Sequence, residues 1–454
     1  MKREKLGSRL GFILLSAGCA IGIGNVWKFP YMAGQNGGGI FVLIYLIFLA
    51  ILGIPVMVME FSVGRGAQKS PVHVFNTLEP KGTKWHIHGY LCMAGNIILM
   101  MYYTTVAGWM LQYFVKTAQG DFVGQSAEGI ATMFGDNLAN PLNQVVAMGI
   151  VVIVGFFINA QGLQNGLERI TKVMMILLLI IMIILAGHSV LVEGGGKGLE
   201  FYLKPSLERM NEVGIVNVIV GAMNQAFFTL SLGIGSMAIF GSYIDKEQSL
   251  LGESVNVAVL DTFVAITAGL IIFPACFAYG VQPDAGPSLI FITLPNIFNH
   301  MVGGRVWGSL FFVFMTFASF STVLAVFENI MACCMDLFGW TRKKTAMICM
   351  VVIFVLSLPC ALGYNILSGI TPFGEGTTIL DLEDFIVSNL LLPGGSIVFI
   401  LFCVSRYGWG WDNFVKEANE GRGMKVKSFM RPYMTYVLPL LATAILIIGL
   451  VNFF

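Results

Sequence analysis

The sequence is 454 residues long, and 56% of its residues are hydrophobic whereas only 11% are charged. Soluble globular domains contain about 25% charged residues, so this composition excludes an ordinary soluble enzyme. The net charge of +1 gives no basic surface for nucleic acid, and high hydrophobicity with low charge excludes a disordered chain. The composition therefore predicts an all-α polytopic membrane protein embedded in a lipid bilayer.

A helix needs about 20 apolar residues to cross about 30 Å of hydrocarbon. Eleven segments reach this length, and we expect transmembrane helices at residues 10–34, 39–66, 88–118, 143–160, 168–191, 215–243, 254–280, 304–335, 345–364, 379–404 and 434–453. The polar stretches between them are short, so residues 1–454 are predicted to form a single transmembrane domain. The apolar stretch 288–298 is too short to span and predicts a re-entrant or capping hairpin. The basic start followed by an apolar run also resembles a signal peptide, but we interpret it as the first mature helix.

Basic residues predict the orientation of these helices. With the N-terminus inside, the inner segments carry 20 Lys and Arg residues and the outer segments carry five. Because cytoplasmic segments of membrane proteins are enriched in Lys and Arg, this asymmetry favours a cytoplasmic N-terminus. Eleven crossings then place the C-terminus outside.

Two of the predicted helices are interrupted by glycine. Residues 22–25 read Gly-Ile-Gly-Asn in the first helix, and residues 233–236 read Gly-Ile-Gly-Ser in the sixth. The two helices are five spans apart, and an odd offset reverses the direction of the chain. The pattern predicts a 5+5 inverted repeat, residues 10–191 and 215–404, with broken helices 1 and 6 and an extra helix at 434–453.

Such interruptions need a compensating contact. Glycine costs about 1 kcal/mol in a helix interior, and each backbone group left unpaired in lipid costs several kcal/mol. A break persists where it lines a cavity, because half-helix N-termini attract anions and freed carbonyls hold cations. The alternative is that the glycines only allow close helix packing. The polar residues Asn25, Thr229 and Ser231 at the same depth favour the cavity.

Residues 22–30, Gly-Ile-Gly-Asn-Val-Trp-Lys-Phe-Pro, precede Asn-Gly-Gly-Gly at 36–39 and Gly-Ile-Pro at 53–55 with Glu60. This series resembles the opening signature of the neurotransmitter:sodium symporter family. Residues 225–233 resemble the sixth helix of that family, and residues 291–295 resemble its outer lid loop.

The resemblance extends from residue 7 to about residue 405. Eleven rather than twelve spans and the lack of an outer cysteine pair make the chain similar to the bacterial amino-acid branch, which includes leucine and tyrosine/tryptophan transporters. It implies a protein of the bacterial cytoplasmic (inner) membrane that uses Na+ at two sites.

The first sodium site implied by the resemblance lies between the first and eighth helices. Its ligands would be the carbonyls of Gly18, Ile21 and Ala318 and the hydroxyls of Ser321 and Thr322. A hard cation prefers several oxygen ligands, which this set supplies. Both hydroxyls could equally bond to carbonyls of their own helix, and only the adjacent break favours the ion site.

The second implied sodium site uses the carbonyl of Ala20 with Asn25, Thr229 and Asp261. Animal relatives have asparagine in place of Asp261 and a serine in place of Ala265, and they balance charge with chloride. The fixed carboxylate here therefore predicts chloride independence. A buried, unpaired Asp costs several kcal/mol, and an adjacent cation would offset that cost. A protonated Asp bonded to a neighbouring helix is the alternative.

For the substrate, the resemblance implies that the backbone N–H groups of Gly22 and Gly24 and the hydroxyl of Tyr103 hold a carboxylate. Monoamine carriers have an aspartate in place of Gly22, so this chain is expected to take an α-amino acid. Further substrate contacts are expected from Ala20, Leu99, Phe228, Thr229, Ser231, Ile234, Ala325 and Val326. The apolar walls favour a hydrophobic or aromatic substrate such as tyrosine, tryptophan or leucine, although each apolar residue could belong to the ordinary core.

Gates are expected on both sides of this site. Lys28 and Asp384 would form the outer pair through water, with lysine in place of the usual arginine. Tyr103 and Phe228 would form an aromatic lid over the substrate.

On the inner side, Arg3, Trp27 and an acidic residue such as Asp336 are expected to close the path, although Trp27 could simply be packed. Glu60 is expected to accept N–H groups of the unwound backbone. Glu328, in the eighth span, has no assigned role, and His86 and His88 lack the further ligands that a metal site needs.

The sequence thus predicts a sodium-coupled symporter that imports an α-amino acid by alternating access. No G-x-S-x-G, H-E-x-x-H or Walker sequence is present, so we expect no enzyme. An amino-acid sensor or an ion channel on the same fold remains the alternative. The pairing of two copies as a homodimer is compatible with the sequence, which does not decide it.

Overall fold

The computed structural model describes residues 4–280 and 288–451, and within these ranges it contains helices and no β-strand. The first half comprises α1 (Arg9–Ala20), η1 (Gly24–Lys28), α2 (Phe29–Gln35), α3 (Gly39–Phe48), η2 (Leu49–Gly53), α4 (Ile54–Ala67), α5 (Pro71–Leu78), α6 (His86–Gln119), α7 (Ala127–Ala139), α8 (Pro141–Ala160), η3 (Leu163–Glu168), α9 (Arg169–Val190), α10 (Gly196–Leu203) and α11 (Leu207–Val213). The η elements are short π-helical turns.

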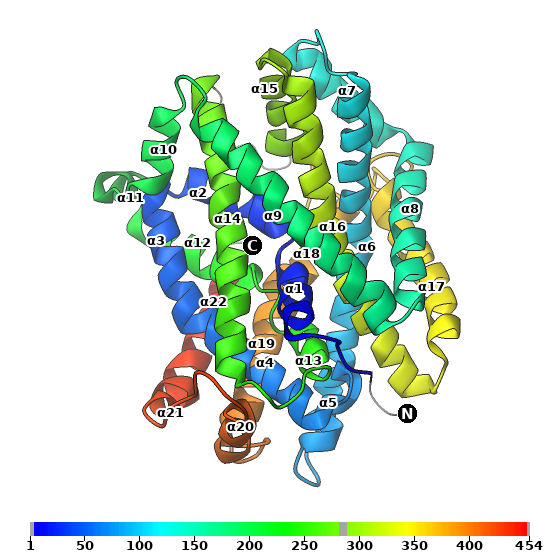
Figure 1. The fold of residues 1–454 in the computed structure, drawn as a ribbon, viewed down its shortest axis with the longest axis vertical. Coiled ribbons are helices and arrows are strands. Elements are labelled where there is room, and N and C mark those ends of the chain that lie inside the picture. The colour runs from blue at the N-terminus through cyan, green and yellow to red at the C-terminus, as the bar shows by residue number, and fades with distance from the viewer. Residues whose placement is uncertain (1–3, 281–287, 452–454) are drawn as a thin grey trace.

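The second half comprises α12 (Ile215–Phe228), α13 (Ser236–Gly241), α14 (Leu250–Ala278), η4 (Leu289–Thr293), α15 (Leu294–His300), α16 (Gly304–Phe338), α17 (Arg342–Leu362), α18 (Ile379–Phe385), η5 (Ile386–Leu391), α19 (Leu392–Val404), α20 (Trp411–Ala418), α21 (Met430–Pro432), η6 (Tyr433–Val437) and α22 (Leu438–Val451). Long helices run along the height of the bundle, with α5, α20 and α21 at its lower end and α7 and α15 at its upper end (Figure 1). We use "lower" and "upper" in this sense below.

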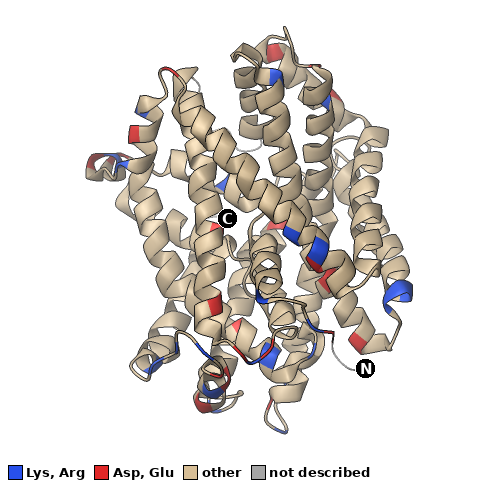
Figure 2. Cartoon of the chain, in the orientation of Figure 1, with Lys and Arg blue, Asp and Glu red and all other residues tan. Residues whose placement is uncertain are grey.

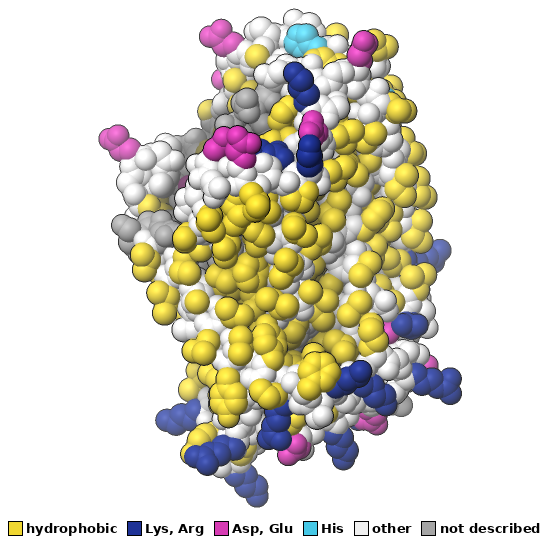
Figure 3. All heavy atoms as spheres, turned by 90° about the vertical axis from the view of Figure 1, so that its left-hand side faces the viewer, with side chains coloured by type: hydrophobic (Ala, Val, Ile, Leu, Met, Phe, Trp, Pro, Cys, Tyr) yellow, Lys and Arg dark blue, Asp and Glu magenta, His cyan; other side chains and the backbone are white. Residues whose placement is uncertain are grey.

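The surface matches a molecule that crosses a bilayer. Hydrophobic side chains cover the middle of the face shown in Figure 3, and Lys and Arg side chains gather towards the lower end. The cartoon in Figure 2 likewise shows the charged residues mainly near the two ends of the bundle. Lipid tails accept apolar side chains but reject charges, so the band between the charged ends is the part suited to hydrocarbon.

Nine helices among the described residues are long and apolar enough to cross a membrane, and the bent pair formed by residues 9–20 and 24–35 would make a tenth. The remaining predicted span, 215–243, is divided into α12 and α13, and α12 alone has 14 residues. The total of eleven spans and the inverted repeat therefore stay predictions, although all-helical architecture is observed.

The first interruption is short and bends the chain. The helix α1 ends at Ala20, and Ile21 adopts an extended conformation with ψ of 100°. The axis of the following segment turns by 58°. The sequence predicted a break somewhere in residues 18–25, and the structure confines it to residues 21 and 22.

The second interruption is longer and contains left-handed backbone. Residues 229–235 are non-helical, and φ is positive at Ser231 (51°), Gly233 (102°) and Gly235 (72°). Glycine adopts this region without strain, whereas a serine there costs about 1–3 kcal/mol. The segment is therefore held by its surroundings.

Neighbouring side chains satisfy the backbone groups freed by this second interruption. Glu60 of α4, fully buried, accepts the N–H of Gly233 and, at 3.2 Å, the N–H of Met237. Asn96 of α6 donates to the carbonyl of Ile234 at 2.8 Å. The contact expected for Glu60 is present, and it explains how an acidic side chain is tolerated at this depth.

The stretch 288–298 is not the hairpin that the sequence predicted. It forms η4 and α15, and Phe291 packs against Trp109, Tyr113 and Phe134 with ring centroids 5.7, 4.9 and 5.1 Å away. This aromatic contact holds the segment on the upper side of the bundle, since burying such rings stabilises a short helix that could not persist alone. The preceding residues 281–287 lie outside the described ranges.

Glu328, without a role in the sequence analysis, lies in an ion pair near the lower end. Its carboxylate accepts hydrogen bonds from Arg342 at 2.6 and 2.9 Å and from the Tyr243 hydroxyl at 2.7 Å. Arg342 also pairs with Glu4 at 3.1 Å. These contacts join the N-terminal segment to α16 and α17.

Gly395 of α19 allows that helix to cross the second interruption closely. A Cβ at Gly395 would overlap the backbone of Gly233, whereas a Cβ at the adjacent Gly394 would meet nothing within 4 Å. We expect Gly395→Ala to lower the free energy of unfolding by about 1–3 kcal/mol, because overpacking forces the backbone apart. Gly394→Ala should be neutral or stabilising by about 0.5–1 kcal/mol. Thermal unfolding of the purified variants checks this, and equal stability of the two would contradict the proposed contact.

Candidate functional site

A cavity of about 540 Å³ lies between the two interruptions; we call it the main cavity. Its walls include residues that the sequence analysis singled out, namely Ala20, Gly22, Gly24, Trp27, Lys28, Leu99, Tyr103, Phe228, Thr229, Ser231, Thr322 and Asp384. They come from α1, η1, α6, α12, α16, α18 and the interrupted segment. The fold thus brings together residues that lie far apart in the chain.

Asp261 of α14 is fully buried beside the main cavity. One carboxylate oxygen accepts from the Asn25 side chain at 2.7 Å, and the other accepts from the Thr229 hydroxyl at 3.0 Å. Asn25 Nδ2 also lies 3.1 Å from the Thr229 hydroxyl. Three of the residues predicted for one sodium site therefore form a single hydrogen-bonded cluster.

The charge of this cluster is not balanced by a basic side chain. Within residues 4–280 and 288–451, no Lys or Arg forms an ion pair with Asp261. No group of three or more His, Cys, Asp or Glu side chains in the same ranges could hold a metal. A cation there would be held by one carboxylate with amide, hydroxyl and carbonyl oxygens, a set that suits hard ions.

Thr322 of α16 faces the first interruption. Its hydroxyl lies 3.2 Å from the carbonyl oxygens of Gly18 and Ile21 and 3.5 Å from that of Ala318. One hydroxyl proton can serve only one of three acceptors at a time. The surplus of oxygen atoms is the arrangement expected for a cation.

Ser321 contributes differently to this second cluster. Its hydroxyl donates to the carbonyl of Ala318 at 2.9 Å, within its own helix. This is the alternative that the sequence analysis left open for both hydroxyls. Both side chains face α1, where a Cβ at Gly18 would lie 3.3 Å from the Ser321 Cβ, but only the Thr322 hydroxyl lies near an α1 carbonyl oxygen in the observed arrangement.

The backbone at the first interruption is partly occupied by internal bonds. The N–H of Gly22 donates to Asn25 Oδ1 at 3.2 Å, and the N–H of Ile23 donates to the Tyr103 hydroxyl at 3.0 Å. A Cβ at Gly22 would overlap that hydroxyl, so an aspartate cannot be placed there without movement. A Cβ at Gly24 would lie 2.8 Å from the Phe228 ring.

Three residues expected in the substrate pocket do not line the main cavity. Ile234 is turned towards α6, where Gly95 leaves room for its branched side chain, and it is 1% exposed. Ala325 and Val326 are buried within the core. They lie in the helix turn after Thr322, where the cavity ends.

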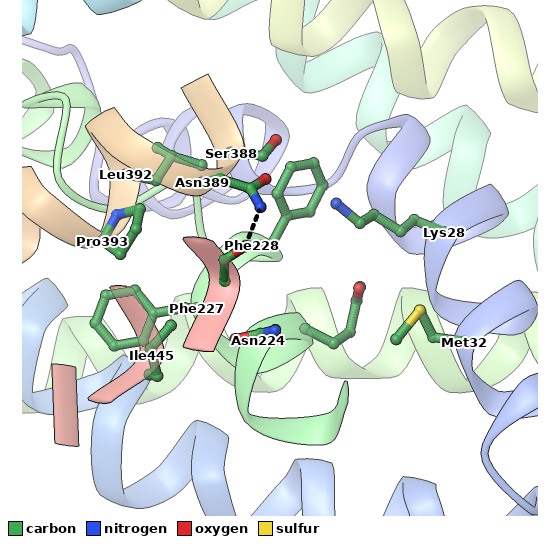
Figure 4. Close-up of a pocket in the computed structure, with 12 residues that line it drawn as sticks. Lys28, Met32, Asn224, Phe227, Phe228, Ser388, Asn389, Leu392, Pro393 and Ile445 are labelled. Carbon is green, nitrogen blue, oxygen red and sulfur yellow. Dashed lines mark hydrogen bonds between the residues drawn. The ribbon is translucent and has the colours of Figure 1, made fainter. Parts of the chain in front are cut away.

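The sequence analysis predicts that Lys28 and Asp384 pair through water, and among the described residues no direct ion pair joins them. Both residues line the main cavity, but the Lys28 ammonium lies 3.6 Å from the centre of the Phe228 ring (Figure 4). Asp384 instead accepts hydrogen bonds from Tyr102 at 3.0 Å and Ser388 at 2.7 Å. The water-mediated pair of Lys28 and Asp384 therefore stays a prediction.

The expectation that Trp27 closes the inner path is wrong. Trp27 lines the main cavity and packs against Phe291 on the upper side, with ring centroids 6.3 Å apart. The physical reason is the bend at residues 21 and 22, which carries Trp27 away from the lower half of the first span.

Of the other inner-side residues, Arg3 lies outside the described residues. Asp336 accepts the N–H of Ser70 at 2.8 Å, at the start of α5. Of the two nearby histidines, His86 bonds to Glu79 at 2.7 Å, whereas His88 packs between Phe75 and Phe399. The two imidazoles therefore do not converge on one site.

The sequence analysis missed much of the aromatic wall of the main cavity. Tyr31, Tyr102, Trp109, Phe134 and Tyr364 all line it. Two of them could have been found, because residues 99, 102, 103, 106 and 109 follow the i, i+3, i+4, i+7 spacing of one helix face. The others come from distant segments and carry no local signal.

A family model described as the sodium:neurotransmitter symporter family matches residues 3–129 and 128–454. The uncharacterised sodium-dependent transporter YhdH of Bacillus subtilis is 35% identical over 401 residues, which cover 88% of this chain and 87% of the relative. An uncharacterised sodium-dependent transporter of Haemophilus influenzae is 30% identical, covering 100% of this chain and 99% of the relative. The crystal structure of MhsT in complex with L-phenylalanine is similar with a TM-score of 0.87 and 36% identity, and the match covers 100% of both chains.

Thr322→Val tests the oxygen cluster at the first interruption. A ligand at 100 times its Kd stabilises a protein by about 2.7 kcal/mol, so sodium should raise the unfolding temperature of the unmodified chain above its value in potassium. We expect Thr322→Val to lose most of this difference. The matched control is Thr316→Val, two turns earlier, whose hydroxyl bonds only to Phe312 in its own helix. An unchanged sodium effect in Thr322→Val would exclude its hydroxyl as a ligand.

Proposed function

Because the chain belongs to the sodium:neurotransmitter symporter family, we propose that it imports an α-amino acid with an apolar or aromatic side chain, driven by sodium and without chloride. Family membership also identifies the chain as a transporter rather than an enzyme. The observation that carries the proposal is the position of the main cavity between two helix interruptions, with an oxygen cluster at each side.

Two sodium ions fit the two clusters in number and chemistry. One would lie at Asp261, Asn25 and Thr229 with the carbonyl of Ala20, and its charge would offset the cost of the buried carboxylate, which is several kcal/mol. The other would lie among the carbonyls of Gly18, Ile21 and Ala318 and the hydroxyls of Ser321 and Thr322. Neither set has more than one formal negative charge, so each ion stays exchangeable.

Two sodium ions supply enough energy for strong accumulation. Each positive charge that enters gains about 2.3 kcal/mol per 100 mV. Two ions moving with a zwitterion therefore gain about 4.6 kcal/mol from the potential alone. Since about 1.4 kcal/mol corresponds to a tenfold ratio, this supports a gradient of roughly three orders of magnitude.

Geometry at Gly22 supports an amino acid as the substrate. There is no room for a carboxylate side chain beside the Tyr103 hydroxyl, so a substrate amine finds no acidic partner there. A substrate that brings its own carboxylate can meet the sodium ion at Asp261 and the Tyr103 hydroxyl. The L-phenylalanine bound to the similar protein MhsT supports the same substrate class.

The aromatic wall supports an apolar or aromatic side chain. Phe228, Trp109 and Tyr102 line the main cavity, and contact with such rings stabilises apolar and aromatic groups. Ser231 supplies a hydroxyl group at the same wall. This hydroxyl would form a hydrogen bond with the phenol group of a tyrosine substrate. Tyrosine, tryptophan, leucine and phenylalanine are the substrates we propose to test first.

The distribution of Lys and Arg supports one orientation of the protein in the membrane. Lys and Arg gather towards the lower end (Figure 3), which also holds the N-terminal segment (Figure 1). We therefore place the lower end in the cytoplasm and the upper end, with α7 and α15, outside. The main cavity would then receive substrate from the upper side.

Reconstituted vesicles test the main claim. With sodium outside, vesicles holding the protein should accumulate radiolabelled L-leucine, L-phenylalanine or L-tyrosine, and replacement of sodium by potassium should abolish uptake. Replacement of chloride by gluconate should have no effect. Uptake that ignores sodium would overturn the proposal. Sodium-dependent binding without flux would indicate a sensor, and a sustained amino-acid-gated current that far exceeds uptake would indicate a channel.

Asp261→Asn tests the source of the balancing charge. Loss of the carboxylate should weaken sodium activation of uptake at least tenfold, about 1.4 kcal/mol, and the residual uptake should become sensitive to chloride. The matched control is Asp412→Asn, at the exposed start of α20, which should behave like the unmodified chain. Equal sodium activation in both variants would exclude Asp261 as a ligand.

A further inference from the structure

The chain between α20 and α22 carries exposed positive charge. Four basic residues lie within residues 422–431, which we call the basic segment, and residues 421–454 contain no Asp or Glu. The four are Arg422, Lys425, Lys427 and Arg431. All of them are exposed, and within residues 4–280 and 288–451 none of them forms an ion pair. Like charges so close together repel one another, so a partner of opposite charge would stabilise the segment.

Contacts with the protein fix the shape of the basic segment. Asn419 donates to the carbonyl of Val426 at 2.8 Å and accepts the N–H of the same residue at 2.7 Å. Val426 is 4% exposed, so its side chain is held against the protein. Its neighbours Lys425 and Lys427 are both exposed. This is the alternation of an extended chain, in which residues i and i+2 share a face, so both ammonium groups are presented outward.

Apolar side chains are exposed beside these charges. Phe429 is 74% exposed, and Met424 is 51% exposed. The basic segment ends in α21 at the lower end of the bundle (Figure 1), where Figure 3 shows Lys and Arg side chains below the hydrophobic middle of the face. It is continuous with the candidate membrane span Met430–Val451. The basic segment therefore lies at the boundary between hydrocarbon and headgroups.

The basic segment is bonded to the chain that joins α13 to α14, residues 242–249, which we call the lower linker. The N–H of Arg422 donates to the carbonyl of Glu247, and the N–H of Ser249 donates to the carbonyl of Arg422, both at 2.8 Å. The Ser249 hydroxyl donates to the carbonyl of Met424. The backbone bonds form a short parallel bridge, so order in one segment is passed to the other.

The lower linker also holds the start of the chain. The N–H of Leu6 donates to the carbonyl of Tyr243 at 3.3 Å, and Lys5 forms an ion pair with Asp245. The linker connects α13, which follows the second interruption, to α14, which carries Asp261. A ligand on the basic segment therefore acts on chain that adjoins both the second interruption and the helix of Asp261.

An anionic lipid matches each of these features. Its phosphate is attracted to Lys and Arg, and a cluster of basic residues beside a membrane-spanning helix is typical of a site for such headgroups. Its hydrocarbon accepts exposed aromatic and Met side chains at the same boundary. A nucleic acid or a soluble acidic protein would match the charge but not the apolar side chains at the edge of the hydrophobic band.

We propose that the basic segment binds the headgroups of anionic lipids in the leaflet at the lower end of the molecule. Lys425, Lys427 and Arg431 donate to the headgroup phosphates, and Phe429 inserts among the hydrocarbon chains. Because the lipid binds the bridged arrangement and not a disordered segment, it favours that arrangement and orders the lower linker. The leaflet is cytoplasmic in the orientation proposed above, and the lipid contact does not depend on the substrate.

Lipid binding to the purified full-length chain in an uncharged detergent tests this surface. Native mass spectrometry should show tighter binding of dioctanoyl phosphatidylglycerol than of dioctanoyl phosphatidylcholine. Each Lys or Arg beside an anionic surface contributes about a fivefold gain in affinity. The double variant Lys425→Gln/Lys427→Gln should therefore weaken the tightest phosphatidylglycerol site by roughly tenfold or more. The variant Lys425→Arg/Lys427→Arg keeps the charge and should keep the affinity.

The matched control is Lys81→Gln/Lys84→Gln, which removes the same charge from the exposed loop between α5 and α6 at the lower end (Figure 1). Its affinity for phosphatidylglycerol should equal that of the unmodified chain. Equal affinity of the two glutamine variants, or no preference for phosphatidylglycerol over phosphatidylcholine, overturns the proposal. Phe429→Ser should also weaken binding, and an unchanged affinity would overturn the insertion of its ring.

Hydrogen exchange in lipid nanodiscs tests the effect on the lower linker. Phosphatidylglycerol in place of phosphatidylcholine should slow the exchange of backbone amides in the basic segment and in the lower linker. The variant Lys425→Gln/Lys427→Gln should lose this difference, and the loop at residues 79–85 should exchange at the same rate in both lipids. Slower exchange in the basic segment alone would refute the ordering of the lower linker.

Two further measurements identify the source of the ligand and the cause of a failure. Soluble glycerol 3-phosphate carries the phosphate ester without hydrocarbon, and it should not displace phosphatidylglycerol at equal concentration. Displacement would make a free phosphate ester the occupant and would overturn the lipid surface. Absence of sodium-driven uptake would refute the proposed function alone, because lipid binding is measured without substrate. Normal uptake without a preference for phosphatidylglycerol would refute the lipid surface alone.

Discussion

A backbone that leaves its helix within a bilayer must find new partners for every freed N–H and C=O group, because hydrocarbon offers none. In this chain, side chains of α4 and α6 bond to three backbone groups at the second interruption. Glu60 accepts two N–H groups, and Asn96 donates to a carbonyl. At the first interruption, the single hydroxyl proton of Thr322 faces the carbonyl oxygens of Gly18 and Ile21 and also that of Ala318 in its own helix. That surplus of carbonyl oxygens supports the proposal that a cation binds at the first interruption.

Charge follows the same rule at Asp261. The Asp261 carboxyl group is buried and bonds to two neutral donors, Asn25 and Thr229, an arrangement that supports the proposed sodium ion. Lys28 presents the complementary case, a partly buried ammonium over an aromatic ring. Lys28 lines the main cavity, and Asp261 bonds to Thr229, which also lines it. The oxygen clusters beside this cavity and the ammonium in its wall support the proposed transport of an amino acid together with sodium.

Short stretches of sequence correctly predicted the features that depend only on neighbouring residues in the chain. The Gly-Ile-Gly pattern at 22–24 and 233–235 predicted two interruptions, and the motif at 22–30 predicted a family that the comparisons confirm. Glu60 was expected to hold freed N–H groups and does so. The wrong predictions concern the direction in which a side chain points and the residues that it contacts. Trp27 was assigned to the wrong side because a bend of 58° has no signature in a list of residues, and Ile234 turns into the space that Gly95 leaves.

The sequence by itself determined the lipid environment, the all-helical class, the positions of the two interruptions and the family. Hydrophobicity, glycine content and charge are local properties of the chain, so they can be read without knowing which residues meet in space. Only the tertiary structure decided which atoms meet. The contact of Asp261 with Asn25 and the contact of Lys28 with Phe228 each join residues far apart in the chain. Such contacts depend on how helices cross and bend, and no short stretch of sequence carries that information.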